Sequence, residues 1–422
     1  MRLRTKTDMA AMKYPVLVSA ALVGVGPGRS AEATAQDATV VDSAGIRIVT
    51  SPAIDMIYAR MAEDASLTIG VVEGPEAQLF ERVVSVARDG EGNLVVADAA
   101  WFQVRTFDAG GDHLWTVGGE GEGPGDFVDL KGAWPRAGGG VIAVDGFLQR
   151  VSAFGSMGEL VRVARIRDSG SPLAYRAWGL DGSESLLGSA TNPSTPGLSP
   201  GETARSLVHV VRHRLDGAIL DTVSQFPGAA GGVAGSGGDI IHMVSLPFSA
   251  APAAAGGVDG VATTGGESYE IHRLDLAGSL RHIARLAEAP PDRTEEHLKA
   301  LVPDDRMRAL YEQLPLPATL SGYVRLVFAD TGELWAQRYL VPGTPSFHWD
   351  VFHPDGRCLG RVEIDASFRV HAVDNGQLLG VHEDAMGVER VQVRDLESGG
   401  GGSAAAEPPA AGSSRTSGSS LN

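Results

Sequence analysis

Short apolar runs that end in aspartate recur along the middle of the chain. Residues 94–98 (LVVAD) are matched 47 residues later by residues 141–145 (VIAVD). Nine residues after each aspartate comes Phe107 or Phe154, and a glycine-containing turn follows in both places. Apolar runs of this length between turn residues are typical of β-strands. The unit therefore predicts a strand ending in aspartate, a short loop, a second strand ending in phenylalanine, a turn and a third strand.

The second half of this unit recurs more loosely at residues 215–217 (LDG), 274–278 (LDLAG) and 352–356 (FHPDG). Repeats of about 40–50 residues that are built from strands are typical of propeller blades. The pattern predicts an all-β fold, a six-bladed β-propeller of four-stranded antiparallel blades. We expect the blades at residues 82–118, 130–166, 175–226, 239–286, 323–364 and 368–396.

Two segments complete this picture of the propeller. The last blade has only three evident strands, and we expect residues 66–70 (SLTIG) to supply the fourth, because an open ring leaves two unpaired sheet edges. Residues 292–313 favour helix, and Pro303 must divide them into two short helices that pack on the propeller. Segments rich in small residues and proline are interpreted as loop insertions at residues 183–206, 228–238 and 249–266.

The two ends differ in composition from the repeats. A basic start, an apolar run of about ten residues and an Ala-x-Ala site predict a signal peptide at residues 1–33. An N-terminal arm is expected at 34–65, the propeller at 66–397, and a flexible Gly/Ser/Ala/Pro tail at 398–422. We therefore expect export to the periplasm or to the outside of the cell.

Charge and cysteine content exclude several classes of function. The 422 residues carry a formal net charge of −17, which argues against a nucleic-acid partner. The single cysteine, Cys358, excludes an intrachain disulfide and a thiolate zinc cluster. No segment after the signal peptide is long and apolar enough to predict a membrane span.

The repeat resembles a known family. Residues 92–98 (GNLVVAD), Phe107-Asp108 and residues 118–127 (GGEGEGPGDF) are similar to NHL-type six-bladed β-propeller repeats. The second unit has Arg150 five residues after its aspartate, as the repeat commonly does, whereas the first unit departs from it with Gln103. Residues 38–397 resemble secreted bacterial propellers of the NHL and TolB-like kind, through the further segments 42–47, 330–335 and 387–390. The resemblance implies a rigid binding platform and names no ligand.

Apparent catalytic motifs do not meet the requirements of their chemistry. Residues 197–201 (GLSPG) fit the nucleophile elbow, but Pro200 has no N–H to donate to an oxyanion hole. The glycines of residues 118–125 lack the spacing of a dinucleotide loop, and no helix follows them. Asp98 and Asp145 are interpreted as turn-capping carboxylates.

Histidines are the remaining candidates for a metal site. Such a site needs ligands that converge on the central channel from the innermost strands, and only His371 lies on a predicted innermost strand. The repeat places His213 and His272 on third strands instead. We therefore predict no metal ligands, no catalytic residues and no cofactor.

Topology indicates where binding is expected. In an up-and-down blade, the loop after the second strand and the connector after the fourth strand emerge on the same face. On that face we expect an exposed aromatic surface beside polar groups, with candidate binding residues Trp101, Phe147, Arg150, Glu120 and Glu122. The alternative is that Trp101 and Phe147 pack between adjacent blades.

These observations favour an exported, non-enzymatic propeller that binds a protein, peptide or glycan. A metal-dependent lyase or lactone hydrolase that uses Ca²⁺ or Zn²⁺ is the alternative, and it is motivated by analogy of fold only. A third possibility is a part of a larger envelope complex in which the C-terminal tail acts as a tether.

Overall fold

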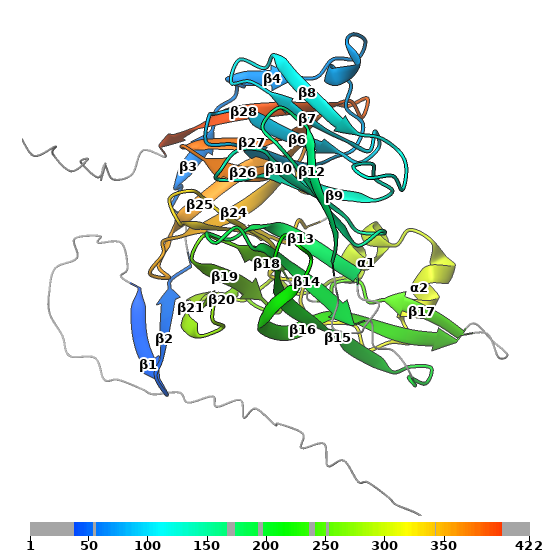
Figure 1. Cartoon of the computed structure of the whole chain (residues 1–422). Coiled ribbons are helices and arrows are strands. Elements are labelled where there is room, and N and C mark those ends of the chain that lie inside the picture. Colours follow the sequence, from blue (N-terminus) through cyan, green and yellow to red (C-terminus); the bar gives the residue numbers. More distant parts are fainter. Residues whose placement is uncertain are drawn as a thin grey trace, which may run out of the picture. The chain divides into compact units, whose positions relative to one another are not determined.

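The computed structural model describes residues 38–53, 56–166, 174–192, 197–235, 241–249, 253–341 and 343–398. The signal peptide expected at residues 1–33 and residues 399–422 of the expected tail lie outside these ranges. The described residues, from Ala38 to Ser398, belong to one unit (Figure 1). Its described strands fall into six sheets, which we number in chain order.

Three of the six sheets have four antiparallel strands each, paired in sequence order. Sheet 1 contains β5 (Val83–Arg88), β6 (Leu94–Asp98), β7 (Gln103–Phe107) and β8 (His113–Gly118). Sheet 2 contains β9 (Leu130–Pro135), β10 (Val141–Asp145), β11 (Arg150–Phe154) and β12 (Leu160–Arg165). Sheet 5 contains β22 (Tyr323–Phe328), β23 (Leu334–Arg338), β24 (Ser346–Phe352) and β25 (Cys358–Asp365). The strand, loop and turn order predicted from the repeats is confirmed in sheets 1 and 2.

The other three sheets carry additional strands. Sheet 3 contains β13 (Ala174–Leu180), β14 (Leu186–Asn192), β15 (Thr203–His213), β16 (Ile219–Gly235) and β17 (Ile241–Ser245). Sheet 4 contains β18 (Ala253–Gly256), β19 (Gly260–Thr264), β20 (Glu270–Asp275) and β21 (Leu280–Leu286), followed at its outer edge by β2 (Ile46–Ser51) and β1 (Thr39–Ser43). Sheet 6 contains β26 (Phe368–Asp374), β27 (Gln377–Glu383) and β28 (Glu389–Ser398), with β4 (Leu67–Ile69) and β3 (Ala59–Met61) both paired to β28.

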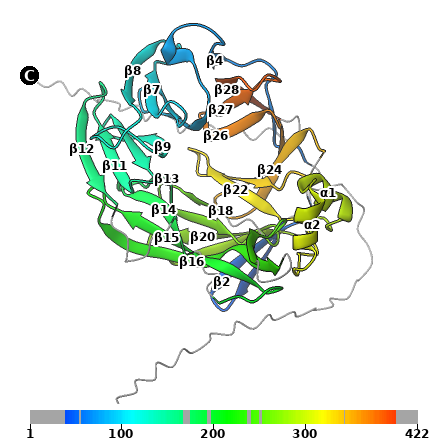
Figure 2. The ribbon, with the colours of Figure 1, turned by 90° about the vertical axis from the view of Figure 1, so that its right-hand side faces the viewer.

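The six sheets form a closed ring with the first strand of each sheet innermost. Contacts link β5 to β9, β9 to β13, β13 to β18, β18 to β22, β22 to β26 and β26 back to β5. Figure 2 shows the first strands β9, β13, β22 and β26 around the centre of the unit and later strands such as β12, β16 and β28 outside them. The fold is a β-propeller with a predominantly antiparallel all-β architecture, as the sequence predicts.

A strand from the N-terminal region completes sheet 6. In β4, Leu67, Thr68 and Ile69 pair antiparallel with Val393, Gln392 and Val391 of β28. The side chain of Ile69 is buried and packs in the cluster between sheets 6 and 1. The expectation that residues 66–70 supply the missing strand is confirmed, and the pairing joins the two ends of the propeller.

The expected boundary between the third and fourth blades is wrong. Residues 241–245 form β17, which pairs with β16 as the fifth strand of sheet 3, so sheet 4 begins at β18 and not at Asp239. The segments interpreted as loops at 228–238 and 249–266 instead contain the end of β16 and the strands β18 and β19. The segment at 183–206 likewise contains β14 and the start of β15. In β18, small residues allow close packing, since a side chain at Gly256 would meet the Leu187 side chain of sheet 3 at 2.4 Å.

The helical insertion has the predicted form. Helix α1 (Glu295–Leu301) begins after Thr294, and α2 (Asp305–Tyr311) begins after Asp304, whose carboxylate accepts hydrogen bonds from two backbone N–H groups. Leu298 of α1 packs with Phe248 and Leu320, and Leu310 of α2 packs in a cluster that includes residues of β16. Both helices lie on the propeller, next to sheet 3 and its connection to sheet 4, as expected. A 3₁₀ turn, η1 (Glu76–Gln78), precedes β5.

Candidate functional site

Two fully buried aspartates hold the loops of the candidate surface in place. The Asp145 carboxylate accepts backbone N–H bonds from Val128 (2.6 Å), Asp129 (3.0 Å) and Leu148 (2.7 Å). It therefore ties the loop between β10 and β11 to the connector that precedes β9. The carboxylate of Asp98 does the same in sheet 1, where it accepts bonds from the backbone before β5 and after β6. The interpretation of both residues as turn-capping carboxylates is confirmed.

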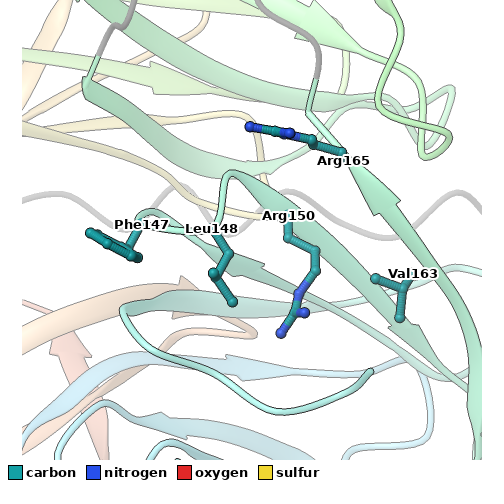
Figure 3. Close-up of a pocket in the computed structure, with 5 residues that line it drawn as sticks. All are labelled: Phe147, Leu148, Arg150, Val163 and Arg165. Atoms are coloured by element: carbon teal, nitrogen blue, oxygen red, sulfur yellow. The ribbon is translucent and has the colours of Figure 1, made fainter. Parts of the chain in front are cut away.

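The loop after β10 presents an exposed aromatic ring. Phe147 exposes 70% of its surface, so it does not pack between adjacent sheets. It borders a hollow of about 350 Å³ whose other lining residues are Leu148, Arg150, Val163 and Arg165 (Figure 3). The alternative reading of Phe147 as a packing residue is wrong, because the second residue of this short loop lies outside the sheet interface.

Arg150 is held at the edge of this hollow by the connector between sheets 1 and 2. Its Nη1 donates to the carbonyl of Glu122 at 2.8 Å, and its Nη2 donates to the carbonyl of Asp126. The connector is itself folded back on its own backbone, with Phe127 N donating to the Gly119 carbonyl at 2.8 Å. The Arg150 guanidinium is therefore fixed in position by two main-chain carbonyls and has no carboxylate partner among the described residues.

Arg165 is a residue of this surface that the sequence reasoning missed. It lies on β12 directly opposite Arg150 of β11, and its side chain is exposed. Figure 3 shows that the two side chains point in different directions, with the Arg150 guanidinium turned toward the connector and Arg165 left at the border of the hollow. The sequence shows that residues 160–165 contain two arginines. That Arg165 lies opposite Arg150 follows only from the pairing of β11 with β12.

The remaining predicted site residues are only partly brought together. The side chains of Glu120 and Glu122 are exposed on the connector, and neither residue lines the hollow. Trp101 is half-buried in sheet 1, where the guanidinium of the fully buried Arg105 lies 5.5 Å from its ring centre. The structure thus groups Phe147 and Arg150 with Arg165, whereas Trp101 belongs to a separate cluster.

Histidines are distributed over the sheets as the repeat predicts. His213 and His272 lie on the third strands β15 and β20, whereas His371 lies on the innermost strand β26. Within the described part of the chain, no group of three or more His, Cys, Asp or Glu side chains is placed to hold a metal ion. The same residues contain no helix that is long and apolar enough to cross a membrane.

Comparisons with known proteins find matches among solved structures. No protein-family model and no curated protein matches the chain. A solved member of the DUF4221 family from Bacteroides vulgatus is similar over 81% of this chain and 98% of its own, with 9% identity and a TM-score of 0.41. Virginiamycin B lyase from Staphylococcus aureus is similar over 86% of this chain and 96% of its own, with 11% identity and a TM-score of 0.37. BamB from Moraxella catarrhalis is similar over 82% of this chain and 100% of its own, with 11% identity and a TM-score of 0.33.

Proposed function

We propose that this chain is an exported, non-enzymatic β-propeller of the NHL and TolB-like kind that binds a protein or peptide through the hollow on sheet 2. The observation that carries the proposal is the exposed Phe147 beside two cross-strand arginines, Arg150 and Arg165. An exposed aromatic ring next to a guanidinium group is a combination enriched at the centres of protein interfaces.

The chemistry of the hollow favours an acidic segment over a glycan. Arg165 is exposed, and no acidic side chain lines the hollow. Guanidinium groups bind carboxylates with two parallel hydrogen bonds, and Phe147 offers an apolar surface to a neighbouring side chain. We therefore propose a partner segment that carries an Asp, a Glu or a terminal carboxylate next to an apolar residue.

The test is site-specific photo-crosslinking in the exporting host. A photoreactive phenylalanine at position 147 is compared with the same group at Met157, which is 81% exposed on the turn between β11 and β12. We expect a defined adduct from position 147, no adduct from position 157, and loss of the 147 adduct when Arg165→Glu is added. The proposal would be contradicted if positions 147 and 157 gave equal yields of crosslinked adduct. It would also be contradicted if Arg165→Glu left the yield from position 147 unchanged.

A further inference from the structure

The innermost strands share one register, which defines equivalent positions around the ring. In sheet 1, Val83 of β5 pairs with Asp98 of β6, and the next pair along these two strands is Ser85↔Ala97. The equivalent innermost residues in the six sheets are Ser85, Gly132, Arg176, Ala253, Arg325 and Arg369. Three sheets thus place a small residue at this level, and the other three place an arginine.

This level lies at the inner rim of the ring and faces the next sheet. The hydroxyl of Ser85 shows the direction, because it accepts from the backbone N–H of Ala133 on β9 at 2.9 Å. Arg176 is exposed, and Arg325 and Arg369 are half-buried, so solvent reaches all three.

The charges of Arg176 and Arg369 both act on Arg325, and a histidine is acted on by Arg325 and Arg369. Burial and the like charges of Arg176 and Arg369 lower the pKa of Arg325 to about 10. His371, the extra residue of a β-bulge in β26, lies close to Arg325 and Arg369. Burial and these two charges lower the pKa of its imidazole, which is therefore neutral at pH 7.

Little within the described part of the chain compensates this positive charge. Glu389 pairs with Nη2 of Arg369, but its other oxygen accepts the backbone N–H of Val83 at 2.7 Å. Nε of Arg369 and Nε2 of His371 are buried and have no hydrogen-bond partner there. Arg176 and Arg325 form no hydrogen bond or ion pair with a described residue. Buried polar groups without partners in a native protein call for an explanation such as an unseen ligand.

We propose that the inner rim of the propeller binds an oxyanion, the carboxylate or phosphate group of a small ligand, between Arg176, Arg325 and Arg369. The planar guanidinium fork matches both groups with paired hydrogen bonds. This site is distinct from the hollow on sheet 2, and its ligand is a small anion rather than a protein segment.

Thermal unfolding and calorimetric titration of the exported chain test this site. Sodium phosphate, sodium succinate and sodium citrate are compared with sodium chloride at equal ionic strength. At least one of the three anions is expected to raise the unfolding temperature and to release or absorb heat on binding. Arg325→Gln should weaken that response at least tenfold, and Arg176→Gln should weaken it several-fold.

One control variant and one further site variant keep the test decisive. Arg162→Gln removes an exposed arginine from the outer strand β12 and should respond to the anions like the parent chain. Arg176 is exposed, so its replacement leaves the buried core intact and remains informative if Arg325→Gln fails to fold. The absence of any response to all three anions would overturn the proposal. An unchanged response in Arg176→Gln and Arg325→Gln would overturn it equally.

Discussion

At the scale of single residues, the repeated aspartate illustrates how one side chain can organise a loop. The carboxylate of the fully buried Asp145 accepts hydrogen bonds from three backbone N–H groups on its two oxygens. A carboxylate that accepts several N–H bonds gives up little of the stabilisation that it has in water. Its position also holds the loop that carries Phe147 against the connector that anchors Arg150.

Replacement of Asp145 should therefore destabilise the fold and loosen the candidate surface together. Asp145→Ala leaves three part-buried backbone donors without their acceptors and should lower the free energy of unfolding by about 3 kcal/mol. Asp145→Asn keeps one acceptor oxygen and should cost about half as much. Urea unfolding measures both, with Asp112→Asn, an exposed turn residue, as the control that should change little. An Asp145→Ala chain as stable as the parent would show that these bonds are not structural.

The sequence pattern predicted the roles of the buried repeat residues better than the positions of the arginines at the inner rim of the propeller. Asp98, Asp145 and Phe107 stand at repeated positions next to apolar runs, so their roles are visible in the sequence. Arg325 and Arg369 stand in strands that do not resemble the repeat closely. Their equivalence depends on the pairing register of each sheet and on the β-bulges that shift it, neither of which a single sequence specifies.

At the scale of elements, local turn and helix signals in the sequence predicted the two helices and the closing strand correctly. The boundary between the third and fourth blades was predicted wrongly, because the strand that begins sheet 4 consists of small residues. Pro303 and the caps Thr294 and Asp304 mark the two helices locally. The strand β18 has the sequence AAAG, which lacks the β-branched and aromatic residues that signal a strand. Its place is determined by close packing against sheet 3, a tertiary contact that no local pattern contains.

The closing strand β4 should contribute measurably to stability although it has only three residues. Ile69→Ala removes a buried side chain between sheets 6 and 1 and should lower the free energy of unfolding by about 2–4 kcal/mol. Thr68→Ala, at an exposed position of the same strand, should change it by less than about 0.5 kcal/mol. Hydrogen exchange should show faster opening of Val391–Val393 in Ile69→Ala only. Equal exchange in both variants would mean that β4 does not hold the ring closed.

At the scale of the whole molecule, an acidic chain encloses a basic inner rim. The formal net charge is −17, yet Arg176, Arg325 and Arg369 occupy one level of the ring. Fixed charges around the axis repel cations and attract anions. This arrangement is unfavourable for Ca²⁺ or Zn²⁺ at the place where a propeller lyase would need to hold it, and it favours the binding function over the hydrolytic alternative.

Metal analysis of the purified exported chain, with unfolding temperatures measured with and without EDTA, separates these two functions. We expect no stoichiometric metal and no effect of EDTA, because the one histidine on an innermost strand, His371, lies beside two arginines within the described part of the chain. The buried carboxylates of Asp98 and Asp145 are likewise already occupied by backbone donors. The matched control adds CaCl₂ and ZnCl₂ to the EDTA-treated chain, which should leave its unfolding temperature unchanged. The contrary result is stoichiometric Ca²⁺ or Zn²⁺ together with a large decrease of the unfolding temperature in EDTA. It would require cation ligands whose attraction exceeds the repulsion from the arginines, and it would favour the lyase or lactone hydrolase over the binding platform.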